Sequence, residues 1–158
     1  MTRLRGRAAR GARLVAAAPH GHWHASSFLA GLRHDRMVAP AVFDGAINGR
    51  SFRAYVERAL APALSSGDVV VLDTLGSHKV RGVREAIQAR GASLRYLPPY
   101  SPDLNPIEQA FAKLKQPIRT AAPRARETLW RSIGTMLDRF KPNECANYLA
   151  NAGYPRSA

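Results

Sequence analysis

Residues 69–73 read Val69-Val70-Val71-Leu72-Asp73, and this stretch decides the fold. Four consecutive apolar residues, three of them β-branched, are typical of a strand that is buried on both faces of a parallel sheet. Sites in open α/β sheets lie beyond the carboxyl ends of the strands, and Asp73 stands at that end. A purely structural position there would favour an apolar side chain. We therefore expect Asp73 to be a functional carboxylate; the alternative is an Asx turn or a helix N-cap.

The segments on either side of this strand predict a mixed α/β fold. Before it, the hydrophobic pattern predicts strands over 13–18, 24–32 and 37–43, then a helix after Asn48. After it, the pattern predicts a helix over 78–90, a strand over 94–97 and a rigid connector over 98–102. Three more helices are expected over 105–117, 125–139 and 143–149. Hairpins followed by alternating strands and helices indicate a mixed sheet.

The composition indicates one basic domain with a polyanionic partner. The chain has 158 residues, and 24 Lys and Arg against 11 Asp and Glu give a net charge of +13. Nucleic acid is the leading partner; codon bias in a GC-rich genome would also enrich arginine, but it need not unbalance basic against acidic residues. No apolar run approaches the roughly 20 residues of a membrane helix. The one cysteine, Cys145, excludes an internal disulfide and a cysteine-based zinc site, and it fits a reducing cytoplasm.

Glu108 is the second candidate carboxylate. Asn105, Pro106 and Glu108 stand where a capping box places its N-cap, first and third residues, so the pattern leaves Glu108 open between capping and chemistry. Two carboxylates at the ends of rigid elements in a very basic domain suggest metal-dependent phosphodiester chemistry, with two Mg²⁺ ions about 4 Å apart. Holding two such ions normally takes three or more acidic ligands, and this sequence offers two well-placed ones.

Long and specific motifs surround both carboxylates. They are Leu72-Asp73-Thr74-Leu75-Gly76-Ser77-His78-Lys79 and Leu97-Pro98-Pro99-Tyr100-Ser101-Pro102-Asp103-Leu104-Asn105-Pro106-Ile107-Glu108-Gln109-Ala110-Phe111. Thirty-four residues separate Asp73 from Glu108. These motifs and this spacing closely resemble the DDE transposases of the mariner superfamily, and the nearest branch is the bacterial insertion sequence 630 group. Residues 19–23 and 145–148 also look like that family, so the resemblance covers nearly the whole chain.

The resemblance implies a ribonuclease-H-like fold, similar to that of retroviral integrases, with Asp73 and Glu108 as ligands of Mg²⁺ or Mn²⁺. The implied activity is DNA transposition: cleavage at element ends, then joining of the freed 3′-hydroxyl to target DNA by in-line phosphoryl transfer. The implied partners are double-stranded DNA of the element ends and target, and a second copy or a full-length transposase, with no membrane. The implied location is the bacterial cytoplasm, at the nucleoid.

The chain departs from the family pattern in two places. Position 74 is Thr where the family usually has Asn, and its hydroxyl can still form hydrogen bonds. The family's first catalytic Asp lies on a strand that precedes the basic loop seen here as Arg3 to Arg13, and this chain begins after that strand. We therefore expect residues 1–158 to be one partial catalytic domain, with 1–13 as a basic arm and 140–158 as a C-terminal tail. Such a domain is expected to be inactive alone and to leave unpaired strand edges.

Four other acids are candidates to substitute for the first Asp: Asp35, Asp44, Asp68 and Asp103. Asp44 follows a predicted strand and is the best placed of them, but the family pattern puts a non-catalytic acid there, so we expect no substitution. The main alternative function is a non-catalytic, basic DNA-binding remnant of a transposase. A weaker alternative is a ribonuclease-H-like nuclease of another purpose.

Several basic side chains are candidates for contact with DNA phosphates. They lie after Asp73, on the Glu108 helix and in the N-terminal arm: His78, Lys79, Lys113, Lys115, Arg3, Arg5 and Arg7. The alternative for the first four is a solvated helix start or an ordinary polar face. His20, His22 and His24 have the residue type of a zinc site, but the prolines and glycines around them favour a turn instead.

Overall fold

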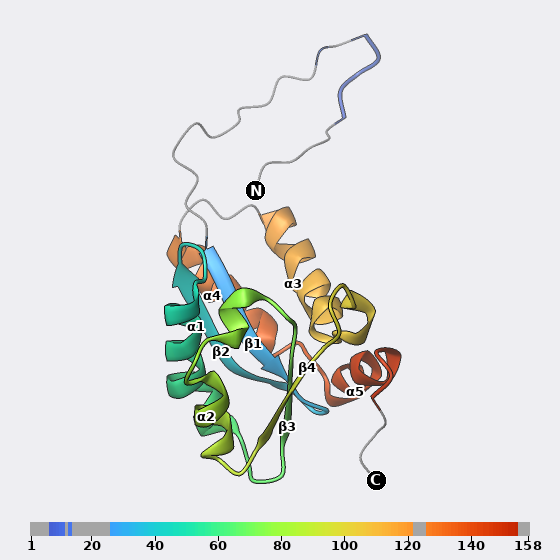
Figure 1. Ribbon diagram of the computed structural model, residues 1–158. Coiled ribbons are helices and arrows are strands. Elements are labelled where there is room, and N and C mark those ends of the chain that lie inside the picture. The colour runs from blue at the N-terminus through green and yellow to red at the C-terminus, as the bar shows by residue number, and fades with distance from the viewer. Residues whose placement is uncertain (1–6, 12, 14–25, 122–125, 155–158) are drawn as a thin grey trace.

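The computed structural model describes residues 7–11, 13, 26–121 and 126–154 (Figure 1). Its first elements are the strands β1 (Ser26–Leu32) and β2 (Met37–Asp44), which pair antiparallel from Ser26 opposite Asp44 to Leu32 opposite Met37. The register shifts by one residue near Ala39, whose φ of 50° lies in the left-handed region. An extra residue on one strand forms a β-bulge, which increases the local twist. The predicted hairpin is therefore confirmed; residues 24 and 25, where its first strand was expected to begin, lie outside the described residues.

The second pair of strands is parallel. β3 (Val69–Leu72) pairs with β4 (Ser93–Tyr96) from Val69 beside Ser93 to Leu72 beside Tyr96. The expectation that β3 is buried on both faces is wrong, because Val69 is 59% exposed and the other three residues are half-buried. Successive side chains of a strand point to opposite faces, and only Val70 and Leu72 pack into the core.

The strands of the described residues form two separate two-stranded sheets, β1–β2 and β3–β4, and not one mixed sheet. Each pair still packs against one common core. In the part of the chain described, no strand pairs with the remaining edge of β1 or of β3. The strand expected over 13–18 falls almost wholly outside the described residues, so the expectation of unpaired strand edges stays a prediction.

Helices on one side of both sheets build the first core (Figure 1). α1 (Gly49–Tyr55) starts at Asn48, whose side chain accepts a hydrogen bond from the Ser51 backbone N–H at 3.0 Å. The helix continues as a π-helical turn, η1 (Val56–Leu60), and a 3₁₀ turn, η2 (Ala61–Ala63). The buried residues of this core come from α1, η1, α2 (Val83–Gln88), β4 and the residue before β4: Phe52, Tyr55, Val56, Leu60, Val83, Ile87, Leu94 and Ala92.

The single helix expected over 78–90 is wrong, because the structure divides this segment. A 3₁₀ turn, η3 (Gly76–Lys79), comes first, and α2 begins only at Val83. Gly82 separates the two with a φ of 98°, a conformation that side chains rarely adopt. A Cβ at Gly82 would also lie 2.6 Å from Arg53 Nε, so a larger residue there would displace the end of the Arg53 side chain.

The last helices build a second core on β1 and β2. After the 3₁₀ turn η4 (Pro102–Leu104) come α3 (Ile107–Ala121), α4 (Arg126–Leu137) and α5 (Pro142–Asn151). The buried members of this core are Ala110, Leu114, Phe140 and Cys145, with Phe28 of β1 packed against them. α3 continues through Pro117, where a break was expected, because a proline removes one backbone donor and can kink a helix without ending it.

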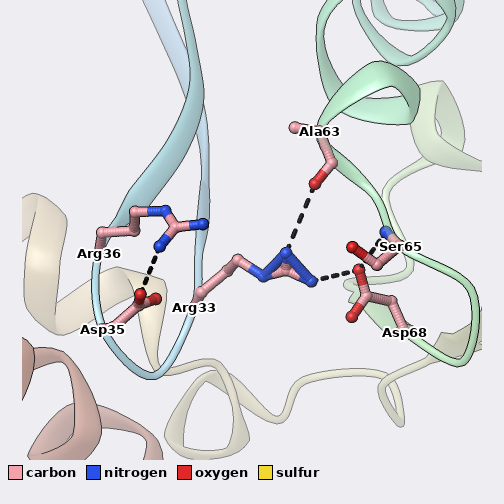
Figure 2. Close-up of polar contacts among 6 residues, drawn as sticks. All are labelled: Arg33, Asp35, Arg36, Ala63, Ser65 and Asp68. Carbon is pink, nitrogen blue, oxygen red and sulfur yellow. Dashed lines mark hydrogen bonds and ion pairs between the residues drawn. The ribbon is translucent and has the colours of Figure 1, made fainter.

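An arginine joins the two sheets at one end. Arg33, directly after β1, forms an ion pair with Asp68, directly before β3, and donates to the Ala63 carbonyl oxygen at 3.4 Å (Figure 2). The same Asp68 oxygen accepts a hydrogen bond from the Ser65 backbone N–H at 2.7 Å. The carboxyl end of β1 therefore lies beside the start of β3. In the described residues, no helix is long and apolar enough to cross a membrane.

Candidate active site

Asp73 lies directly beyond β3, as the sequence predicts for a functional carboxylate. Its Oδ1 atom accepts a hydrogen bond from the Leu75 backbone N–H at 3.0 Å, which is an Asx turn. The same oxygen lies 2.6 Å from His78 Nδ1. The described residues provide no partner for Oδ2, and the side chain is 35% exposed. Asp73 therefore forms the Asx turn that was the alternative to a functional role, and its second oxygen, Oδ2, still has no partner among the described residues.

His78 points inward from η3 towards Asp73. Its side chain is only 14% exposed, and its ring lies on that of Phe52, with 4.1 Å between the ring centroids and 32° between the planes. The Tyr96 hydroxyl, at the end of β4, donates to the His78 carbonyl oxygen at 2.9 Å. The sequence motif did not predict this inward orientation, because Phe52 and Tyr96 lie on distant parts of the chain.

Glu108 lies in the first turn of α3 and is exposed. The capping box that was its alternative role does not form. The Asn105 backbone N–H, which a capping glutamate would bind, donates instead to the Pro102 carbonyl oxygen at 2.9 Å. Within the described residues, the Glu108 carboxylate has no hydrogen bond or ion pair. It is therefore available for a ligand.

An open pocket of about 470 Å³ adjoins Glu108. It is formed by η4, the start of α3 and the end of α5, and its lining includes Pro102, Asp103, Asn105, Glu108, Gln109, Ala112 and Asn151. Asn151 donates to the Gln109 side chain at 3.3 Å, and Tyr154 donates to the Leu104 carbonyl oxygen at 2.9 Å. The end of α5 and the residues after it thus hold the first turn of α3, which carries Glu108, and the preceding turn η4. The sequence did not indicate this role.

The four other acids have distinct surroundings. Asp68 is paired with Arg33 and Asp35 with Arg36, so both are structural (Figure 2). Asp103 lines the Glu108 pocket, whereas Asp44, the best placed by sequence, is the last residue of β2. The described part of the chain contains no group of three acidic, histidine or cysteine side chains arranged to hold a metal. Asp73 and Glu108 each carry the hard oxygen ligands that Mg²⁺ prefers, and their joint role as ligands stays a prediction.

The predicted phosphate contacts divide into exposed and engaged side chains. Lys79, Lys115 and Arg7 are exposed, and Lys79 Nζ lies 5.9 Å from the centroid of the Tyr96 ring. Lys113 is engaged: its Nζ lies 2.5 Å from Glu144 of α5 and 4.6 Å from the centroid of the Phe140 ring. Arg3, Arg5 and the three alternating histidines lie outside the described residues.

The Lys113 pair also involves Tyr148. Burial alone would raise the pKa of Glu144, but hydrogen bonds from Lys113 and from the Tyr148 hydroxyl, at 2.6 Å, lower it overall. A DNA phosphate could therefore bind Lys113 only by competing with a carboxylate that is already in place.

Residues 1–130 match a domain family described as "DDE superfamily endonuclease". The chain belongs to this superfamily. The match covers the Asp73 motif and the Glu108 motif together, and it confirms a DDE superfamily endonuclease domain; the mariner superfamily and its insertion sequence 630 branch stay predictions. Comparison with curated proteins gives no significant match.

Solved transposase structures share the fold of this DDE endonuclease chain. The crystal structure of the catalytic domain of Mos1 mariner transposase has a TM-score of 0.63 and 14% identity over 85% of this chain and 82% of that one. The Mos1 mariner paired-end complex with Mn and the Mos1 paired-end complex with left transposon end both have a TM-score of 0.71 and 14% identity, over 96% of this chain. The chain spans about half the length of those two transposases, at 48% and 47%. The ribonuclease-H-like fold class is thus confirmed.

Proposed function

We propose that this DDE endonuclease chain is the catalytic domain of a transposase that cleaves DNA and transfers strands, with Asp73 and Glu108 as metal ligands. The observation that carries the proposal is the pair of available carboxylates in the two family motifs. One is fixed at the carboxyl end of β3, and the other is exposed on the first turn of α3. The insertion sequence 630 motifs favour a bacterial insertion element, so the chain would act on element ends and target DNA in the cytoplasm, at the nucleoid.

The candidate site residues have separate tasks in this mechanism. The Leu75 N–H and His78 fix the Asp73 carboxylate through Oδ1 and leave Oδ2 for a cation. Glu108 presents its carboxylate from a helix whose first turn is anchored by the end of α5. Bound Mg²⁺ or Mn²⁺ would polarise the scissile phosphate and activate water or a 3′-hydroxyl. Exposed Lys79, Lys115 and Arg7 would bind the DNA backbone, since phosphate contacts position a duplex without reading its sequence.

We propose that a third carboxylate comes from a strand seated between β1 and β3. Each of these strands is paired on one edge only within the described residues. Because the Arg33–Asp68 pair joins the end of β1 to the start of β3, an inserted strand could run antiparallel to β1 and parallel to β3. Its carboxyl end would then lie beside Asp73. A second copy or a full-length transposase could supply such a strand in trans.

Metal-dependent nicking of supercoiled plasmid tests the proposal. The chain is prepared alone and with an added N-terminal segment that encodes an apolar strand ending in Asp. We expect nicking in Mg²⁺ or Mn²⁺ only with the added segment, and its loss in Asp73→Asn or Glu108→Gln. No cleavage by the extended chain on any element end or plasmid, although it is folded and binds DNA, would contradict the proposal.

A non-catalytic DNA-binding remnant is the second candidate. It is favoured by the net charge of +13 and by the lack of a three-acid group among the described residues. Each phosphate contact steepens the salt dependence of DNA affinity, with a slope of about −0.9 per contact. For a remnant, Asp73→Asn leaves that slope unchanged, and metal produces no cleavage in any form of the chain.

A further inference from the structure

We infer that His78 is a positioning residue for the Asp73 carboxylate rather than a contact for DNA phosphate. The inference rests on the proposed function, because it assigns the cation to Asp73. The first observation is that the His78 ring faces Asp73: its Nδ1 atom is buried and lies 2.6 Å from Asp73 Oδ1. The Nδ1 atom has no aligned hydrogen-bond partner, so this close contact is the polar interaction that the described residues give it.

The second observation is that two elements hold the histidine in this orientation. Phe52 of α1 lies against one face of the ring, at 4.1 Å between centroids. The Tyr96 hydroxyl of β4 holds the His78 backbone through its carbonyl oxygen at 2.9 Å. The next residue of the same 3₁₀ turn, Lys79, is exposed. A side chain meant for DNA would not need a fixed, 14% exposed position against a buried aromatic ring.

The third observation concerns the division of oxygens on Asp73. The Leu75 N–H and His78 both approach Oδ1, so the plane and rotation of the carboxylate are set from one side. Oδ2 then points away from both groups. Partners that orient a metal-binding carboxylate are worth about 10- to 100-fold in metal affinity. His78 would therefore set the affinity of the Asp73 site for a divalent cation without touching the cation.

Mn²⁺ titration of the full 158-residue chain, followed by electron paramagnetic resonance, tests this role without any need for cleavage. His78→Phe keeps a ring against Phe52 but removes the Nδ1 atom that contacts Asp73, and we expect Mn²⁺ to bind about 10-fold more weakly. His78→Asn restores a donor near the Nδ1 position, and we expect affinity within about threefold of the parent. Asp73→Asn is the positive control, and Arg81→Ala, which removes an exposed cation from the same loop, is the matched charge control.

DNA affinity in metal-free buffer gives the second readout. We expect His78→Phe to bind a DNA duplex as the parent does. If both His78 variants lower DNA affinity and reduce the salt slope by about one, with Mn²⁺ binding unchanged, then His78 is a phosphate contact and the inference is wrong.

The outcomes separate this inference from the proposed function. Unchanged Mn²⁺ binding in Asp73→Asn overturns both. Weaker binding in Asp73→Asn with parental binding in His78→Phe overturns the inference alone. If His78→Phe does not fold, Tyr96→Phe is the substitute, because it removes only the hydroxyl that holds the His78 carbonyl. We expect it to weaken Mn²⁺ binding by about threefold, a smaller effect than for a direct partner; unchanged binding would contradict the inference.

Discussion

The two ends of β3 carry the two aspartates Asp68 and Asp73, only five positions apart, and the structure uses them in opposite ways. Asp68 is neutralised by the Arg33 guanidinium and capped by a backbone N–H at the same oxygen (Figure 2). Asp73 is held by a backbone N–H and a histidine through one oxygen, and the other oxygen is available. An acid with an arginine partner joins two parts of the fold, whereas an acid held on one side only can bind a ligand.

The Phe52→Ala variant should give the largest effect, because it removes packing from the Asp73 end. Phe52 is 3% exposed and contacts both the first core and the His78 ring. Truncating a buried phenylalanine costs about 3–5 kcal/mol of unfolding free energy. Urea unfolding measures the loss. Trp130→Ala is the control, since Trp130 is 40% exposed; equal losses in both variants would contradict the assignment of Phe52 to the support of this end.

The Gly82→Ala variant is expected to cost about 1–3 kcal/mol, because alanine would be strained at a φ of 98° and its Cβ would meet Arg53. The loss acts on the turn between η3 and α2, and so on the position of His78. Gly76→Ala is the matched control: Gly76 opens η3, and a Cβ there meets nothing within 4 Å. Thermal and urea unfolding should show that Gly82→Ala is less stable than Gly76→Ala. Similar stability of the two variants would contradict the claim that the backbone at Gly82 favours glycine.

The Asp68→Asn variant tests the other end of β3. The Arg33 hydrogen bond holds the pKa of Asp68 below its usual value, against the opposing effect of burial. A pKa lowered by folding adds stability above the unfolded pKa of about 3.9, and this stability is lost as pH falls through the folded value. We expect Asp68→Asn to cost about 1 kcal/mol at pH 7, and less as pH falls below about 4.

Urea unfolding of the parent and of Asp68→Asn from pH 7 to pH 2 measures this difference. Asp73→Asn, unfolded in urea at pH 7, is the matched control for removing an aspartate charge at the other end of β3. If Asp68→Asn costs the same free energy at pH 2 as at pH 7, the ion pair does not join the two sheets in the way described.

The Tyr154→Phe variant should have the smallest effect on stability, about 0.5–1.5 kcal/mol for one lost hydrogen bond. Its hydroxyl holds the Leu104 carbonyl, at the loop that leads to Glu108. Hydrogen exchange should therefore speed up for the Asn105 and Glu108 amides and remain unchanged in β3. A uniform increase over the whole chain would show a global rather than a local role.

The sequence predicts the frame of the fold and the places of the two candidate acids within it. Strong local signals account for this: the apolar run that ends at Asp73, the turn between the first two strands and the periodic apolar residues of α3. Asp73 and Glu108 are placed correctly at the ends of their elements, because a strand end and a helix start are local features. Their shared role in metal binding stays a prediction.

The sequence does not predict features that depend on distant contacts. The inward orientation of His78 requires Phe52 and Tyr96, which lie 26 positions before it and 18 positions after it. The capping box at Glu108 fails because η4 already uses the Asn105 N–H, and this turn is not evident from the motif. The exposure of Val69 depends on which strands pair with β3, and hydrophobicity alone does not specify pairing.

Cys145 is a built-in probe of local opening in the second core. It is the single cysteine of the chain, its exposed fraction is 0%, and burial raises the pKa of its thiol. A thiol in this state reacts slowly with alkylating reagents until the helices around it separate. The rate of alkylation therefore reports the opening of α3 from α5 without an introduced label. The alkylation rate of this native thiol thus measures how often the part of the fold that anchors Glu108 opens.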